Sequence, residues 1–345
     1  MRKTSPATWI NVIVIAAFFL LSIAGRKAGA QTFCVYDPLA AGGDYYAMFK
    51  DYQLAAKRWG VELTLQPYAD DQKLRDAFVG GQCDMASMIG FRALEFNKFT
   101  GTLDAPGVID NYAQERQAMV VMASPKLASK MSSGGYEVVG LLPIGAAYVV
   151  SHDRSINSLG RARGKKVATA SWFKPSHALA QEVGATPVDV EFPLMGQAFR
   201  KGDVDFIVVP IALYKAWELG NTLGTSGGIV RRPFIQFSMQ LISHADRFPP
   251  GFGQMSREYM LGQCNFALSL AHNMEEGVDS RVWIYSMHQE ILNWDSTMRR
   301  ALVNMVKAGY YDNKMLDVLK RIRCVSDKDE PECAPSLQQQ REAQP

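Results

Sequence analysis

Short apolar runs alternate with amphipathic stretches along most of the chain. Continuous or alternating apolar residues predict strands, whereas apolar residues spaced three and four apart predict helices. The predicted strands are residues 31–37, 61–67, 84–89, 165–170, 187–192 and 204–209. The predicted helices between them are residues 44–58, 70–80, 175–183 and 194–201. Regular alternation of strands and helices is typical of an α/β fold.

Longer extended runs separate and follow these blocks. Residues 118–123, 136–151 and 234–243 have the apolar content of strands, and residues 282–292 and 298–319 carry apolar residues at helical spacing. We therefore expect a chain that crosses between two lobes, each with a mixed sheet flanked by helices, and that ends in a helical C-terminal region.

The crossings divide the chain into a discontinuous lobe 1, residues 31–145 and 244–333, and a lobe 2, residues 146–243. Two α/β lobes joined in this way are expected to form a crevice between them. Open α/β sheets bind ligands in a crevice at the carboxyl ends of their strands. A hinge between two such lobes would let the crevice close on a small molecule.

The first thirty residues have the order of a secretory signal peptide. Arg2 and Lys3 precede an apolar run over residues 9–24, and a motif of small residues ends at Ala30. We expect cleavage after Ala30, so that the mature chain begins at Gln31 in the periplasm. The alternative is a permanent N-terminal anchor, because the apolar run approaches the minimum of about 17 residues for a membrane-spanning helix.

Removal of this segment changes the charge of the protein. The 345 residues include 37 Lys and Arg and 34 Asp and Glu, a formal charge of +3. Four of the basic residues and none of the acidic ones lie in residues 1–30, so the mature chain carries about −1. Because no basic patch interleaved with aromatic residues remains, we expect no nucleic-acid partner. A hydrophobic content of 48% indicates a folded protein, although residues 334–345 are polar and Gln-rich and predict a disordered tail.

Five cysteines lie in the part of the chain that we expect to be exported, where disulfides persist. Cys34 lies in the first predicted strand and Cys83 at the start of the third, and these positions suit a disulfide if the strands are neighbours. Cys324 and Cys333 bracket a short polar segment and are expected to form a second disulfide. Cys264 would then remain as a buried thiol.

Two stretches of the chain carry recognisable motifs. Residues 61–86 read as a strand and a helix followed by Gly81-Gln82-Cys83-Asp84-Met85-Ala86. Residues 159–205 contain, in order, Gly164-Lys165-Lys166-Val167, Gly184-Ala185-Thr186-Pro187-Val188 and Gly202-Asp203-Val204-Asp205. In order and spacing these motifs resemble the periplasmic solute receptors of tripartite ATP-independent (TRAP) transporters. The resemblance implies the two-lobed, type II architecture of periplasmic binding proteins. The resemblance implies a receptor that captures a small molecule between its lobes and delivers it to a membrane permease.

The chain departs from that family at two ligand-binding positions. An Arg that contacts the substrate carboxylate in acid-binding receptors corresponds to Ala168, and an Asn before a Pro corresponds to Val209. Neither side chain can form a charge-assisted, bidentate hydrogen bond with a carboxylate. The resemblance therefore implies the fold and the receptor role but not a carboxylate ligand.

Residues that follow the predicted strands are candidates for ligand contacts. Ser87 and Arg92 follow the third strand, where Arg92 is either a ligand contact or part of a surface or interlobe salt bridge. Trp172, Phe173 and Lys174 come shortly after Ala168. Aromatic faces stack on planar ligands and attract cations, and packing of these two rings against the hinge is the alternative.

Further candidates lie at the ends of other elements. Tyr45 follows Gly42 and Gly43, which either bring backbone N–H groups close to a ligand or form an ordinary turn. Glu191 and Tyr214 end elements of lobe 2. Hinge candidates are Pro143 and Gly145 in the first crossing and residues 238–243 in the second.

The sequence contains no His-Glu-x-x-His motif, so we expect no metal site. We also expect no cofactor and no enzymatic activity. The leading hypothesis is a monomeric solute receptor for a TRAP-like permease. A receptor of the same fold that presents its ligand to a sensor, without transport, is one alternative. A periplasmic enzyme on this scaffold, with dispersed catalytic residues, is the other.

Overall fold

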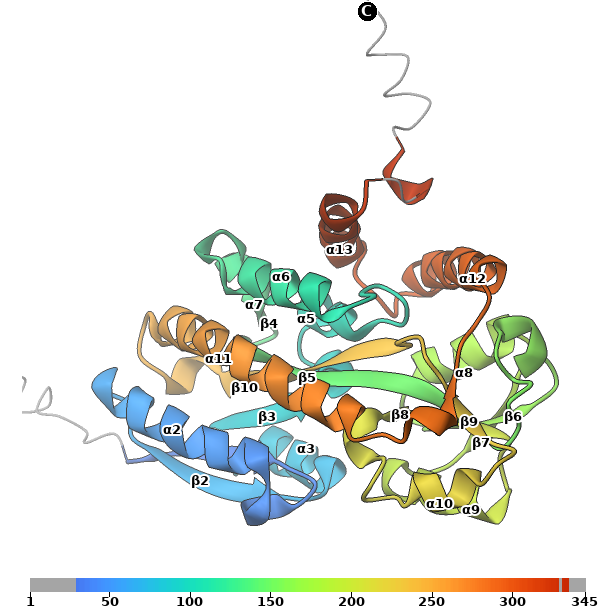
Figure 1. Ribbon diagram of the computed structural model, residues 1–345. Coiled ribbons are helices and arrows are strands. Elements are labelled where there is room, and N and C mark those ends of the chain that lie inside the picture. The colour runs from blue at the N-terminus through green and yellow to red at the C-terminus, as the bar shows by residue number, and fades with distance from the viewer. Residues whose placement is uncertain (1–28, 329–330, 335–345) are drawn as a thin grey trace, which may run out of the picture.

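One mixed sheet runs through the molecule and joins its two halves (Figure 1). The computed structural model describes residues 29–328 and 331–334. The main path of the sheet is β2 (Leu63–Tyr68), β1 (Gln31–Tyr36), β3 (Met85–Ile89), β10 (Ile235–His244), β5 (Tyr136–Ser151), β8 (Phe206–Pro210), β6 (Lys166–Thr169) and β7 (Thr186–Asp189). Three short strands pair beside it, namely β4 (Ser132–Ser133), β9 (Gly228–Val230) and β11 (Trp283–Ile284). We call the β2–β1–β3 half lobe 1 and the β8–β6–β7 half lobe 2.

Lobe 1 is built on parallel pairing of β1 with β2 on one side and β3 on the other. Helices α2 (Asp44–Arg58) and α3 (Asp71–Val79) follow β1 and β2 in the chain. The buried ring of Tyr52 in α2 packs edge-on against Phe33 of β1. Asp70 caps α3 with its side chain, as the sequence predicts.

Short helices complete the two lobes. In lobe 1 these are α4 (Gly90–Ala93), α5 (Lys98–Gly101), the 3-10 turn η2 (Thr102–Asp104), α6 (Tyr112–Ala123) and α7 (Ala128–Met131). In lobe 2 they are α8 (Lys174–Glu182), α9 (Met195–Lys201) and α10 (Leu219–Leu223). The left-handed conformation of Gly202, with φ of +78°, ends α9 before the chain enters β8.

Two long antiparallel strands, β5 and β10, connect the lobes. Their register shifts between Phe237, which pairs with Gly145, and Ser238, which pairs with Pro143. Ile144 is therefore left over as a bulge, and Gly145 adopts a φ of +99°, which residues with a side chain rarely reach. The hinge positions predicted from the sequence thus include the irregular part of this strand pair.

Helix α11 (Phe252–Glu276) lies along β5 and passes from lobe 1 to lobe 2 (Figure 1). At its C-terminal end Glu275 accepts hydrogen bonds from the hydroxyl groups of Tyr112 in α6 and Tyr148 in β5. The Tyr148 hydroxyl lies 2.6 Å from the carboxylate. One carboxylate therefore ties this helix to both a lobe 1 helix and a crossing strand.

The chain then returns to lobe 1 through two further helices. After β11 adds to β9, α12 (His288–Lys307) packs against α8 of lobe 2 and α13 (Asn313–Ser326) packs against α6 of lobe 1. Gly309, with φ of +79°, lies in the turn between them, and Asp312 caps α13. The helical C-terminal region predicted from the sequence is confirmed.

Two segments have a different secondary structure from the one that the sequence predicts. Residues 118–123, which the sequence predicts as a strand, form the C-terminal half of α6. The helix begins earlier, where Asn111 accepts a hydrogen bond from the backbone N–H of Gln114, and a short apolar run alone does not distinguish the two structures. Residues 282–292 are expected to be helical, but Trp283–Ile284 forms β11 because it pairs with β9.

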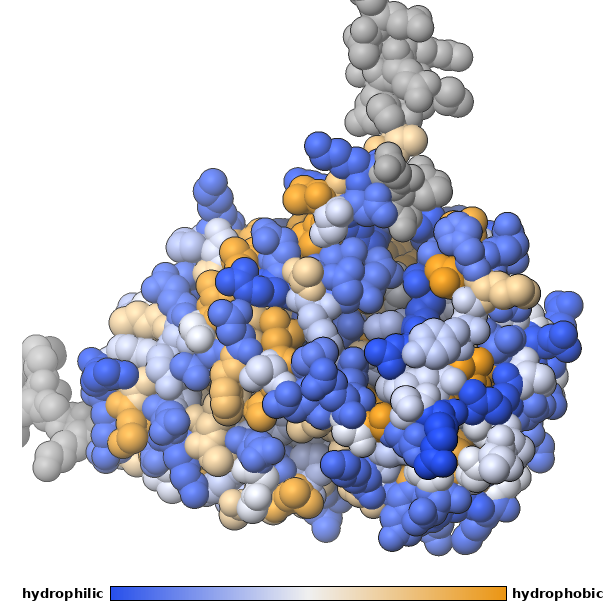
Figure 2. All heavy atoms as spheres, viewed as in Figure 1, coloured by the Kyte–Doolittle hydropathy of each residue, from blue (hydrophilic) through white to orange (hydrophobic). Residues whose placement is uncertain are grey.

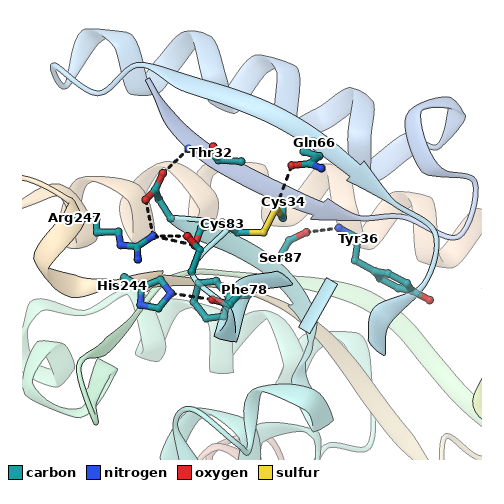
Figure 3. The surroundings of a disulfide bond; sticks show 11 residues. Thr32, Cys34, Tyr36, Gln66, Phe78, Cys83, Ser87, His244 and Arg247 are labelled. Carbon is teal, nitrogen blue, oxygen red and sulfur yellow. Dashed lines mark hydrogen bonds and ion pairs between the residues drawn. A yellow bond between two sulfur atoms is a disulfide. The ribbon is translucent and has the colours of Figure 1, made fainter. Parts of the chain in front are cut away.

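The structure contains both predicted disulfides. The first joins Cys34 of β1 to Cys83, just before β3, with their Cα atoms 5.8 Å apart (Figure 3). In the same region the backbone N–H of Tyr36 donates to Ser87 Oγ at 3.0 Å, which adds a second link between β1 and β3. The second disulfide joins Cys324 to Cys333 after α13, and Cys264 is a buried free thiol as expected.

Two predicted segments lie largely outside the described residues. These are the signal peptide, residues 1–30, and the disordered tail, residues 334–345, of which the structure describes only 29–30 and 334. Within the described ranges, no helix has the length and apolar content needed to cross a membrane. On the face seen in Figure 2, hydrophobic residues are interspersed among hydrophilic ones.

We expect the two disulfides to differ in their contribution to stability. Cys34–Cys83 closes a loop with a sequence separation of 49, and Cys324–Cys333 closes one with a separation of 9. Chain entropy then predicts losses of about 4 and about 2.6 kcal/mol when both cysteines of a pair are replaced by Ala. Urea unfolding followed by circular dichroism would measure both losses, and a larger loss for Cys324–Cys333 would contradict the prediction.

Candidate ligand-binding site

A cavity of about 140 Å³ lies where the two lobes meet. Lobe 1 and the crossing strand β10 contribute Phe91, Ile235 and Phe237 to its wall, and lobe 2 contributes Trp172, Phe173 and Phe192. Smaller apolar side chains of β6 and α8 complete the lobe 2 side. None of the described residues that line the cavity is charged. Such a wall offers a solute mainly apolar and aromatic contacts.

Phe91 is the centre of the aromatic contacts between the lobes. It lies in α4, directly after the carboxyl end of β3. The centre of its ring is 5.5 Å from that of Trp172, 5.3 Å from that of Phe173 and 5.5 Å from that of Phe237. The expected position of the crevice, at the carboxyl ends of the strands, agrees with this placement.

Arg92 lies next to the cavity without lining it. Its guanidinium is nearly fully buried and donates to Asp71 at 2.7 Å and to Glu95 at 3.2 Å. The guanidinium carbon also lies 3.4 Å from the centre of the Trp172 ring, across the lobe boundary. Arg92 therefore holds an aromatic residue of the cavity wall by a cation–π contact while its charge is balanced within lobe 1.

The structure brings only some of the sequence-predicted residues together. Trp172 and Phe173 line the cavity. Ser87 is buried within the sheet, where it accepts the hydrogen bond from Tyr36, and the Tyr45 hydroxyl donates to the carbonyl of Ile144. The remaining three predicted residues are not in the cavity wall; Lys174 and Glu191 are exposed and Tyr214 is half-buried.

The two positions at which the chain departs from the TRAP pattern have different environments. Ala168, in β6, lines the cavity, so the absence of an Arg leaves that part of the wall apolar. Val209, in β8, is buried in a hydrophobic cluster of lobe 2 and does not line it. In the described part of the chain no group of three or more His, Cys, Asp or Glu residues is arranged to hold a metal ion.

The C-terminal region supplies wall residues that the sequence reasoning missed. Trp294 of α12 and Tyr311, between α12 and α13, both line the cavity. The Trp294 ring stands perpendicular to that of Phe234, with ring centres 5.6 Å apart. On the next residue, Asp295 pairs with Arg232, which fixes this end of α12 to the segment before β10. Trp294 and the cavity wall were missed because this residue falls between the two stretches predicted as helical, residues 282–292 and 298–319.

This combination of features defines a class of protein. Two α/β halves joined by crossing strands, with a cavity between them, form a solute receptor of the periplasmic binding-protein type. The chain belongs to the AdeT 1/2 solute-binding protein family, whose model matches residues 53–338.

Relatives of the chain carry the same description. It is 38% identical over 300 residues to the probable solute-binding protein AdeT1 of Acinetobacter baumannii, a match that covers 87% of this chain and 99% of that protein. It is 24% identical over 233 residues to the probable solute-binding protein AdeT2 of the same organism, covering 68% of this chain and 98% of that protein. The predicted role of solute-binding protein is confirmed.

Solved structures share the fold. A TRAP periplasmic solute-binding protein from Desulfovibrio salexigens with bound orotic acid aligns with a TM-score of 0.68 and 13% identity, covering 86% of this chain and 98% of that one. A TRAP periplasmic solute-binding protein from Rhodoferax ferrireducens with bound malonate gives a TM-score of 0.66 and 15% identity, covering 85% and 98%. The resemblance to the TRAP receptors noted in the sequence is thereby confirmed at the level of the fold.

We expect Arg92 to contribute much more to stability than its neighbour Arg75. Substitution Arg92→Met leaves Asp71, whose side chain is 13% exposed, without its cation, and should lower the free energy of unfolding by about 3 kcal/mol. Arg75→Met removes a more exposed pair with the same Glu95 and should cost less than about 1 kcal/mol. Urea unfolding of both variants is the measurement, and equal losses would show that the buried Arg92 contacts add nothing.

Proposed function

We propose that this protein captures a small, uncharged and mainly apolar solute between its lobes. The observation that carries the proposal is the interlobe cavity with aromatic walls and without a charged lining residue among those described. Trp172 and Phe173 are the sequence-predicted residues that we propose as direct contacts. For Arg92 we propose an indirect role, in which it orients the Trp172 ring.

The chemistry of the wall argues against a carboxylate ligand. The receptors of similar fold bind acids such as orotic acid and malonate. Transfer of an ionised carboxylate into an apolar site without a cation costs several kcal/mol. At Ala168 this chain has a methyl group where acid-binding receptors carry an Arg, and the buried Arg92 is already paired with Asp71 and Glu95.

We further propose that the captured solute is delivered unchanged to a membrane permease in the periplasm. Membership of a solute-binding family and the shared fold of TRAP receptors support this role. The proposed lobes are residues 31–145 with 244–333, and 146–243. Closure would bend the chain at the bulge beside Gly145, because strand pairing is already interrupted there.

A charge placed in the cavity wall should weaken the binding of an apolar probe. We expect Ala168→Arg to weaken binding of 1-aminonaphthalene, which is neutral near pH 7, by at least about tenfold, since the new charge must be buried or must fill the cavity. Fluorescence titration of the purified mature protein measures the affinity.

The matched control is Ala216→Arg, which adds the same charge to lobe 2 at an exposed position outside the cavity wall. It should bind the probe as the unmodified protein does. Equal affinities of the two variants would contradict the assignment of the cavity, and native mass spectrometry of the purified protein would identify any solute that it retains.

Export can be tested separately from binding. If the signal peptide is cleaved after Ala30, protein recovered from the periplasm should begin at Gln31 and lack residues 1–30. Intact-mass spectrometry distinguishes this product from an anchored, full-length chain. Recovery of the full-length chain in the membrane fraction would favour a permanent anchor.

A further inference from the structure

A buried carboxylate links α4 of lobe 1 to the crossing strand β10 behind the cavity wall. Asp104, the last residue of η2, is only 3% exposed. One of its oxygens accepts a hydrogen bond from the Ser238 hydroxyl at 2.6 Å, and the other accepts from the Ser238 backbone N–H at 2.9 Å. The backbone N–H of Gly90 also donates to this carboxylate. The approach is so close that a Cβ at Gly90 would lie 2.3 Å from an oxygen of Asp104.

The two segments that Asp104 holds each carry an aromatic residue of the cavity. Phe91 follows Gly90, and Phe237 precedes Ser238. Both rings line the cavity, and their centres are 5.5 Å apart. The register shift of the crossing strands also falls between Phe237 and Ser238, where the ladder of β10 with β5 is irregular. Asp104 therefore supplies hydrogen bonds at a point where strand pairing alone positions the backbone poorly.

The hydrogen bonds around Asp104 are those of an ionised carboxylate. The Ser238 hydroxyl accepts from the Gln240 side-chain amide at 3.0 Å and donates its own proton to Asp104. A proton on the carboxyl group would force that hydroxyl to turn, and it would remove the charge that strengthens the two bonds from backbone N–H groups. Protonation would thus loosen the hold on Gly90 and Ser238.

The surroundings place this protonation in an accessible pH range. Burial raises the pKa of Asp104 to about 7, against the opposing effect of its hydrogen bonds with Ser238 and Gly90. Glu115 of α6, whose oxygens have no hydrogen-bond partner, faces it, and burial followed by the charge of Asp104 raises the pKa of Glu115 well above its usual value. Tyr311 also faces Asp104, and burial is the main reason that its own pKa is raised.

Three charged residues on elements near η2 have partners other than Asp104. Arg92 of α4 pairs with Asp71 and Glu95, and Lys98 of α5 donates to the carbonyl of Gly309. Asp312 caps α13 with its carboxylate, and its backbone N–H donates to the hydroxyl of Thr102. None of these supplies a cation that would keep Asp104 ionised.

We propose that Asp104 is a positioning residue for the solute cavity, which it holds in its binding-competent shape through Gly90 and Ser238 when its carboxylate is ionised. Solute binding is then stronger above neutral pH than below it. This inference rests on the proposed function, since it assigns a pH dependence to the same cavity.

The effect on stability has the opposite sign. Because the pKa of Asp104 is raised from 3.8 to about 7 on folding, its contribution favours the fold most at about pH 3.8 and below, and it is lost as the pH rises from there to about 7. Acidification should therefore stabilise the fold while it weakens solute binding. A carboxylate that only stabilised the fold would not make stability and solute affinity change in opposite directions with pH.

The test compares the unmodified protein with Asp104→Asn across the pH range from about 5.5 to about 8.5, which brackets the pKa of about 7. The Asn side chain imitates the protonated acid, because its oxygen accepts from the backbone N–H groups and its NH₂ donates to the Ser238 hydroxyl. The probe is 1-aminonaphthalene, which stays neutral over this range.

We expect the dissociation constant of 1-aminonaphthalene from the unmodified protein to rise about fivefold on acidification, as the loss of a charge-assisted hydrogen bond suggests. In Asp104→Asn it should stay at the low-pH value throughout. Glu115→Gln, at the other buried acid, is the control and should keep the pH dependence. A flat profile in the unmodified protein, or an unchanged profile in folded Asp104→Asn, would overturn the proposal.

Two further measurements keep the proposal testable if the Asn variant does not fold or the probe does not bind. Ser238→Ala removes a hydrogen bond that favours the ionised form, so the midpoint of the affinity profile should move to higher pH. In ligand-free protein at about pH 8, either variant should show faster hydrogen exchange in peptides containing residues 90–91 and 237–238. Unchanged exchange would overturn the positioning role. Faster exchange without probe binding at any pH would count against the proposed function alone.

Discussion

The antiparallel pairing of β5 with β10 is the interaction on which the rest of the structure depends. These strands lie in the middle of the sheet, so their backbone hydrogen bonds connect the strands of lobe 1 to those of lobe 2. Without that pairing each half would expose an unpaired strand edge. The pairing is irregular at two places, one of them beside Gly145. Since Phe237 pairs with Gly145 and lines the cavity, the proposed hinge and part of the proposed ligand site share one piece of chain.

The charges near the cavity lie behind its aromatic surface. Arg92 balances its charge with Asp71 and Glu95 and presents its flat face to Trp172. Asp104 lies beneath the segment that carries Phe91. These groups orient the aromatic rings without offering a charge to the solute. Under the proposed function, discrimination against ions would follow from the cost of removing them from water, with no need for a repulsive group in the wall.

Features that depend on local pattern could be predicted from the sequence. The helix over residues 44–58 and the long strand over residues 136–151 agree with α2 and β5, because apolar spacing and the turn residues around them are local properties. The two disulfides followed from the strand order and from loop length.

Features that depend on contacts between distant segments could not be predicted from the sequence. Trp294 reaches the cavity only because α12 crosses back to α8, and the partners of Arg92 come from two other elements and the opposite lobe. All five residues of β3 are buried, so the pattern did not reveal that Ser87 faces β1 rather than the crevice. The prediction of a strand at residues 118–123 was wrong because the spacing of apolar residues in so short a run fits a helix as well as a strand.

The distribution of the disulfides has a consequence for how the two halves respond to oxidation. Both covalent links lie in the part of the chain assigned to lobe 1, and residues 146–243 contain no cysteine. Lobe 2 therefore reaches its full intrinsic stability in a reducing as well as an oxidising compartment, whereas lobe 1 gains its cross-links only under oxidising conditions. The redox state of the surroundings therefore acts directly on the covalent links of one half only.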